Sequence, residues 1–208
     1  MTLRTLSAIA CFVAFPSFAA ITPPSQPFDA ISWKARSESK PASVLRIGTF
    51  LVHFEETTLA DVQRTVGAGL IDHQGDAGES IYWVCYTFGN ERIWIIADGE
   101  MGGSTHAVTG ISAQHLPKAK AEADCPSLPR TYRPASLQRG LWLGLTEAEA
   151  SKILGAPSHS EGAWRSFDFQ TKVPGKCGPN GYDLGNWLLI KFNGGRAETL
   201  IAGQVTSC

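Results

Sequence analysis

Few of the side chains that could carry out catalysis stand in a catalytic spacing. The histidines match no His-Glu-x-x-His zinc pattern, and most of them fall in predicted loops. The sequence also lacks a Gly-x-Ser-x-Gly nucleophile elbow. Each histidine is therefore predicted to be solvated rather than a metal ligand or a general base. The histidines are His53, His73, His106, His115 and His159.

Two other stretches have residue types that hold ligands in some proteins. Residues 99–104 are rich in glycine but lack the Lys-Ser or Lys-Thr ending of a phosphate-binding loop, which predicts a hairpin turn instead. Asp72, Asp76 and Glu79 could bind calcium, but their spacing does not match an EF-hand loop. We therefore predict a protein that is not an enzyme and that uses no metal and no cofactor.

The cysteines indicate disulfide bonds rather than a thiol nucleophile or a zinc site. The chain has five cysteines, of which Cys11 lies in the N-terminal segment. The remaining ones form no Cys-x-x-Cys pattern, and an even number in an exported chain favours two disulfides. These remaining cysteines are Cys85, Cys125, Cys177 and Cys208.

The N-terminal segment has the layout of a secretory signal peptide. Arg4 precedes an apolar run over residues 6–15, and Ser17 and Ala19 are placed for cleavage after Ala19. The apolar run is shorter than the roughly 20 residues of a membrane-spanning helix, and the residues before Cys11 match a lipoprotein signal poorly. We expect a periplasmic or secreted protein with no membrane span after cleavage.

The composition is that of a folded domain without an obvious charged partner. The formal net charge is −1 and the basic residues are scattered, which does not favour nucleic acid or an anionic membrane surface. Hydrophobic residues make up 43% of the chain, an ordinary value. Removing 19 of the 208 residues leaves about 190, enough for one sizeable domain or two small ones.

Two stretches of the chain predict the same short helix. In residues 57–69 and 144–157, a threonine precedes a run of helix formers that ends at Gly-Ala. Thr58 and Thr146 are predicted N-caps, and an acidic residue three positions later completes an approximate capping box in each case. The glycine is expected to end each helix in the left-handed conformation. Such matching residues at matching positions predict an internal repeat.

Each predicted helix is followed by aromatic and β-branched runs that glycine and asparagine turns separate. The runs span residues 81–88, 91–99 and 106–113 in the first half, and 163–170, 186–195 and 197–205 in the second. They predict antiparallel strands. The fold class is therefore α+β, with two tandem copies of a short helical segment and an antiparallel meander. The copies are expected to form one curved sheet with the helices on one face.

The second copy resembles a known family. Its turn Gly144-Leu145-Thr146, the helix end Leu154-Gly155-Ala156-Pro157 and the turn Asn193-Gly194 are similar to the tandem-repeat fold of the beta-lactamase inhibitory proteins. They also resemble the related single-copy domain of small outer-membrane assembly lipoproteins. In the first copy Glu56-Thr57-Thr58 replaces the turn, while Asp98-Gly99 keeps the later one. The resemblance covers the chain from about Val44 onward, and its short motifs support fold more than function.

The repeat divides the chain into five segments. Residues 1–19 are the signal peptide, 20–43 an irregular N-terminal arm, 44–114 the first copy, 115–135 a polar connector and 136–208 the second copy. A short helix is predicted in the connector from Lys118 to Ala123.

The repeat also favours one disulfide pairing among the three that four cysteines allow. Cys125 and Cys208 each follow the last strand of a copy, whereas Cys85 and Cys177 lie in or just after the first strand. The symmetric pairs are Cys85 with Cys125 and Cys177 with Cys208.

Alternation along the strands separates the two faces of the predicted sheet. The face expected to form the core under the helices carries Tyr86, Phe88, Ile93, Ile95 and Ala97 in one copy, and Phe167, Phe169, Leu188, Ile190 and Phe192 in the other. The opposite face carries four of the six tryptophans together with small and charged residues. Large aromatic residues mixed with polar ones are typical of a binding surface.

We therefore expect this second face to bind a partner. The expected binding residues are Trp83, Trp94, Trp164, Trp187, Thr87, Asp168 and Lys191. The resemblance implies the same use, since the inhibitory family grips its target with the concave face of its sheet. The alternative is that the arm, the connector or the neighbouring copy covers these tryptophans.

The predicted function is an exported, non-catalytic protein that engages a protein partner through this face, with enzyme inhibition as one version. Binding of cell-wall glycan by the same tryptophans and a scaffold role in envelope assembly are the alternatives.

Overall fold

The protein is a mixed α and β structure in which most strands are antiparallel. The computed structural model describes residues 21–28, 34, 37–76, 80–99, 105–175 and 181–207. The predicted signal peptide, Cys177 and Cys208 lie outside these residues, so the pairing of the last two cysteines stays a prediction. Among the described residues, none of the helices combines the length and the apolar character that crossing a bilayer requires.

The α-helices begin where the capping residues predict. Helix α1 (Leu59–Val66) has Thr58 as its N-cap and helix α2 (Glu147–Leu154) has Thr146, and both capping boxes form. Gly67 ends α1 in the left-handed conformation, as predicted, with φ 72° and ψ 14°. Gly155 ends α2 with φ 83° and ψ −161°, which is not the predicted helical conformation. The reason is that the chain runs directly into the extended segment before β8 (His159–Glu161).

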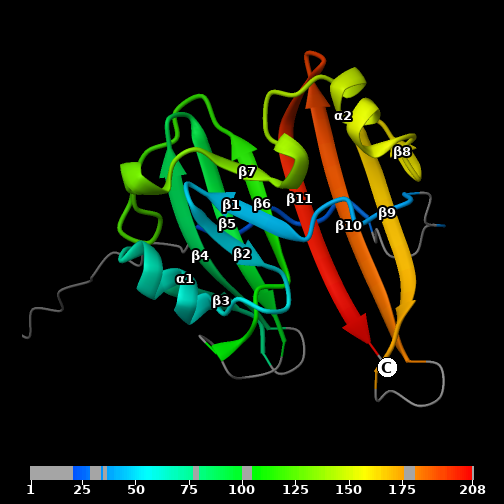
Figure 1. Ribbon diagram of the computed structural model, residues 1–208. Helices are drawn as coiled ribbons and strands as arrows, with labels where there is room; N and C mark the ends of the chain where they lie inside the picture. The colour runs from blue at the N-terminus through cyan, green and yellow to red at the C-terminus, as the bar shows by residue number, and fades with distance from the viewer. Residues whose placement is uncertain are drawn as a thin grey trace, which may run out of the picture.

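The described strands form a large sheet and a small one, both antiparallel (Figure 1). The large sheet has the order β3-β4-β5-β6-β11-β10-β9-β8. From the first half of the chain it takes β3 (Ile71–Gln74), β4 (Ile81–Phe88), β5 (Glu91–Asp98) and β6 (Gly110–His115). From the second half it takes β8, β9 (Trp164–Val173), β10 (Tyr182–Asn193) and β11 (Arg196–Ser207). The halves meet where β6 pairs with β11.

The small sheet joins the starts of the two halves. It has the order β2-β1-β7, with β1 (Val44–Ile47), β2 (Phe50–His53) and β7 (Ala135–Leu137). Two 3₁₀ turns flank β7 in the described chain, η4 (Arg130–Tyr132) and η5 (Gln138–Gly140). The sequence did not predict these strands or β3 and β8, because three or four residues are too few to show an alternating pattern.

Two sequence expectations differ from the structure in local detail. The strand expected at residue 106 starts only at Gly110, because the Val108 backbone is paired with Glu55 and Thr57 ahead of α1. The connector forms no helix over residues 118–123. Its backbone instead makes a tight turn in which Glu122 and Cys125 exchange two hydrogen bonds.

The largest hydrophobic cluster combines buried residues of α1, α2 and the small sheet with one alternating set from the large sheet. The predicted core residues in this cluster are Tyr86, Ile93, Ile95, Ala97, Phe167, Leu188, Ile190 and Phe192. Phe88 packs against the cluster, whereas Phe169 is only half-buried. The assignment of the core face from alternation is therefore confirmed for most of its residues.

The predicted disulfide between Cys85 and Cys125 is present and joins β4 to the connector across a separation of 40 residues. Replacing both cysteines by alanine should lower the free energy of unfolding by about 2–4 kcal/mol, because the unfolded chain gains the entropy of an open loop. Urea denaturation of the double variant beside the parent chain measures this loss. An unchanged free energy of unfolding would mean that the disulfide does not constrain the chain.

Candidate functional site

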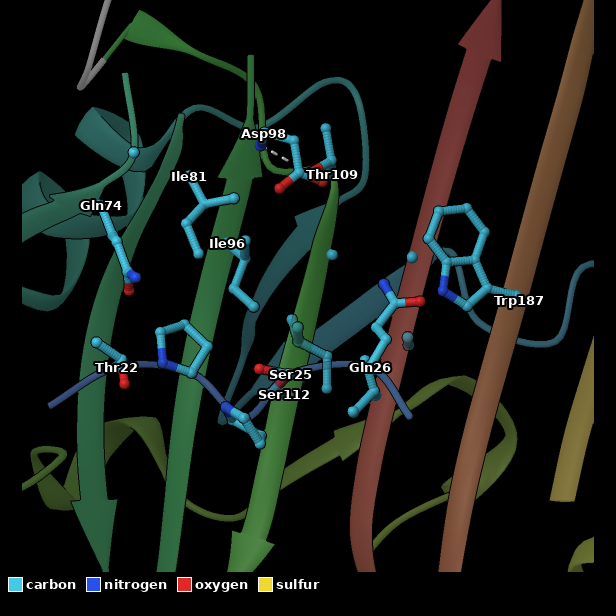
Figure 2. A pocket seen from close by; sticks show the side chains of 18 of the residues that line it. Thr22, Ser25, Gln26, Gln74, Ile81, Ile96, Asp98, Thr109, Ser112 and Trp187 are labelled. Carbon is cyan, nitrogen blue, oxygen red and sulfur yellow. Dashed lines mark hydrogen bonds between the residues drawn. The ribbon is translucent and has the colours of Figure 1, made fainter. Parts of the chain in front are cut away.

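The N-terminal arm crosses the face of the large sheet that carries the tryptophans (Figures 1 and 2). At one side of this face, the Ile21 N–H donates to Asp124 Oδ2 at 3.0 Å, and the Ile21 carbonyl accepts from Trp94 Nε1 at 3.0 Å. At the other side, Phe28 packs against a buried cluster that contains Trp187. Further along, the Ser37 N–H donates to a β9 carbonyl at 3.0 Å. The arm is thus anchored on both halves of the sheet.

The tryptophans on this face are covered, which corrects the expectation of an exposed surface. Trp83 is 1% exposed, Trp94 2% and Trp187 8%, while Trp164 is half-buried. Trp83 and Trp94 pack with the disulfide and with Ile21. The structure agrees with the alternative stated above, in which the arm and the connector cover the tryptophans. Alternation placed the residues on the right face but carried no information about what lies over it.

Two of the polar residues expected at the surface are buried as well. Thr87 is 3% exposed, because its backbone pairs with the connector: its N–H donates to the Pro126 carbonyl at 2.9 Å and its carbonyl accepts from Leu128. Asp168 is 2% exposed, and both of its carboxylate oxygens accept from the Ser166 hydroxyl, at 3.0 and 2.9 Å. These contacts hold the fold together. They leave neither side chain free for a partner.

Burial and local hydrogen bonds set the ionisation of this carboxyl group. Burial raises the pKa of Asp168, while its hydrogen bonds with Ser166 and Ser158 oppose the shift. Lys191 differs from the buried set, since it remains half-exposed and pairs with Glu198 at 3.2 Å. Of the expected binding residues, Lys191 and Trp164 are therefore the ones that keep substantial contact with solvent.

A cavity of about 540 Å³ lies between the arm and the large sheet (Figure 2). Arm residues 22–26 form its roof, and Gly110, Ser112 and Gly203 belong to its floor on β6 and β11. Among the described residues, arm residues 22–26 make no hydrogen bond to the sheet. The arm therefore spans the cavity as a strap held at its two ends.

Side chains from both halves of the sheet form the walls. Ile81 and Ile96 line the cavity from β4 and β5, and Trp187 lines it from β10 (Figure 2). Asp98 and Thr109 lie together at one end, where Thr109 Oγ1 donates to Asp98 Oδ2 at 3.1 Å. The cavity thus sits over the β6–β11 junction, where the two halves of the chain meet.

Two glycines allow close packing in the cavity floor. Gly110 and Gly203 are paired across β6 and β11. A Cβ on Gly203 would lie 2.3 Å from the Trp187 ring, and a Cβ on Gly110 would lie 2.4 Å from the Ala202 carbonyl oxygen. Glycine at 203 lets the indole lie across the neighbouring strand. A glycine inside a strand often marks such a close approach, so Gly203 within the predicted strand was a usable signal.

Two residues that line the cavity each have a buried polar atom without a hydrogen-bond partner. Ser112 is 0% exposed, and its Oγ has no partner. Trp187 is 8% exposed, and its Nε1 has no partner either. Most buried polar groups in folded proteins are paired, and leaving one unpaired costs about 1–3 kcal/mol. Both residues line the cavity, but their unpartnered atoms are covered in this structure, so an occupant would bond to them only after the residues over them move aside.

The charged groups of the cavity are acidic. Its lining contains Asp76 and Asp98 and, among the described residues, no Lys, Arg or His. Partial burial raises the pKa of Asp98 and the hydrogen bond from Thr109 opposes the shift, although the side chain still reaches solvent. An anionic occupant would meet these carboxylates without a compensating cation.

The acidic residues considered for calcium do not form a site in the described part of the chain. Asp72 lies in strand β3 rather than in a loop, and Glu79 is outside the described residues. No cluster of three or more His, Cys, Asp or Glu side chains is arranged to hold a metal among the residues that the structure describes.

No protein-family model, curated protein or solved structure matches this chain.

The unpartnered hydroxyl gives a prediction about stability. Ser112→Ala should leave the free energy of unfolding unchanged or raise it by up to about 1 kcal/mol, because no hydrogen bond is lost. Ser166→Ala should lower it by about 1–3 kcal/mol, because the buried Asp168 carboxylate loses the hydrogen bonds from the Ser166 hydroxyl. Chemical denaturation of both variants without added ligand makes the comparison. Equal losses in the two variants would show that Ser112 is bonded within the protein.

Proposed function

We propose that this chain is an exported, non-catalytic binding protein whose ligand occupies the cavity between the N-terminal arm and the large sheet. The observation that carries the proposal is the pair of buried, unpartnered atoms at this cavity, Ser112 Oγ and Trp187 Nε1. Binding pockets are typically apolar spaces with a few placed polar groups, of roughly 300–1,000 Å³. The cavity of about 540 Å³ falls within that range.

Two independent observations support export. Residues 1–19 have the composition of a signal peptide. The Cys85–Cys125 disulfide is of the kind that persists in oxidising compartments such as the periplasm or the extracellular space.

We further propose that the two halves of the chain are tandem copies with their helices on one face of the shared sheet, as in the inhibitory family that the sequence resembles. In support, β6 to β3 on one side and β11 to β8 on the other run outward from the β6–β11 junction. The helices α1 and α2 carry the same capping box, and both contribute buried residues to the main cluster. The cavity would then lie on the axis that relates the copies.

A variant that fills the cavity tests the binding function. Ser112→Leu places a larger side chain on the cavity floor and should abolish ligand binding while the fold persists. Ligand-observed NMR with a mixed library of small metabolites, recorded on the parent chain and on this variant, measures the effect. The proposal fails if the parent binds no library member, or if every bound compound binds the variant equally well.

A protein partner is a second candidate because the arm itself is a chain segment docked on this face. Ile21 and Phe28 occupy apolar sites at the two ends, while the residues between them make no hydrogen bond to the sheet in the described structure. An extended segment of another protein with similarly spaced apolar residues could take the same path if the arm were displaced.

One substitution separates these two candidates by the sign of its effect. Phe28→Ala removes an anchor of the arm. If the ligand sits under the arm, the loosened roof should weaken its binding by about tenfold, since a buried phenyl ring contributes at least 1.5 kcal/mol. If a partner replaces the arm, the same change should strengthen partner binding. Titration of the library ligand and pull-down of envelope proteins, each with the parent and the variant, decide between them.

A further inference from the structure

The unpartnered atoms of the cavity define the chemistry that its occupant must supply. Trp187 Nε1 is a donor only, so it requires an acceptor atom on the occupant. The Ser112 hydroxyl both donates and accepts. At the end of the cavity, the Asp98 carboxylate accepts one hydrogen bond from Thr109 and has capacity for further donors. The occupant must therefore present acceptors near the floor and donors near Asp98.

Several ligand classes fail one of these requirements. An anion meets Asp76 and Asp98 with no Lys, Arg or His among the described lining residues. A protonated amine only donates, so it leaves Trp187 Nε1 unpaired. A hydrocarbon chain leaves both Ser112 Oγ and Trp187 Nε1 unpaired, and each unpaired atom would keep its cost of about 1–3 kcal/mol.

Hydroxyl groups meet both requirements, because each one donates and accepts. The roof and walls add amide and hydroxyl side chains that match hydroxyl groups, among them Gln26 and Gln74 (Figure 2). Between these polar groups the lining is apolar, with Ile81, Ile96 and Pro24. A ring with hydroxyls around its edge and C–H groups on its faces has the same division between polar rim and apolar faces.

We propose that the cavity binds a neutral saccharide, with Ser112 and Trp187 bonding ring or hydroxyl oxygens and Asp98 accepting from a sugar hydroxyl. This inference rests on the proposed binding function and adds the class of ligand. It differs from glycan stacking on exposed tryptophans, because Trp187 acts through its N–H at the edge of a covered cavity.

Two sugars that share one ring and differ in charge test the inference. Glucose is neutral, whereas glucuronate carries a carboxylate. We expect isothermal titration of the purified protein to show binding of neutral sugars, namely glucose, N-acetylglucosamine or one of their β-1,4-linked disaccharides. Glucuronate should bind at least tenfold more weakly than glucose.

Variants assign the binding to the two unpartnered atoms. Ser112→Ala and Trp187→Phe should each weaken the bound sugar by about three- to tenfold, the effect of one lost hydrogen bond. Trp142→Phe is the matched control, because the Trp142 indole N–H donates to Glu91 Oε2 at 2.9 Å and does not line the cavity. It should leave the affinity unchanged. Circular dichroism of each variant confirms that the fold is retained.

Each contrary result has a distinct meaning. Equal or tighter binding of glucuronate, or no loss of affinity in the Ser112 and Trp187 variants, overturns the saccharide inference. Preferential binding of a neutral peptide probe, N-acetyl-alanine amide, also overturns the saccharide inference but leaves the proposed function standing. The same holds if every neutral sugar fails to bind while the metabolite library yields a ligand whose binding Ser112→Leu abolishes. If the library yields no such ligand either, both proposals fail.

Discussion

A sheet that is apolar on both faces loses stability wherever either face meets water, because burying apolar surface contributes about 25 cal/mol per Å². The large sheet has this property. Its first face is covered by the main cluster with residues of α1, α2 and the small sheet. On its second face the tryptophans need a separate cover, and the chain supplies it with the arm and the disulfide-linked connector. The need to cover this second face accounts for the path of both segments.

The way in which this cover is attached creates the cavity. The arm bonds to the sheet at Ile21 and packs through Phe28, and the residues between these anchors only bridge the gap. Beneath them, the paired glycines Gly110 and Gly203 have no room for a Cβ, because the Trp187 ring and the Ala202 carbonyl pack against them. The cover is therefore tight at both ends and open in the middle. A space lined by both polar and apolar side chains, two of which carry unpartnered polar atoms, is the consequence, and the proposed binding function rests on it.

The features that the sequence predicted are those set by local chemistry. Thr58 and Thr146 cap their helices through contacts three residues away, so the capping boxes are readable from sequence spacing. Alternation identified Tyr86 and Phe167 as core residues for the same reason. The position of the arm depends instead on contacts such as Trp94 with Ile21, which are 73 residues apart and follow no periodicity. For this reason Trp83, Trp94 and Trp187 were assigned to the correct face but wrongly expected to be exposed.

Nuclear Overhauser effects measure the contact between the arm and the second face. We expect cross-peaks between the Phe28 ring and the side chains of Trp187, Leu189 or Ile201, and between Ile21 and the Trp94 indole. Absence of both sets, together with rapid solvent exchange of the Trp94 indole N–H, would contradict the account, because the tryptophan face would then be open and no roofed cavity would exist.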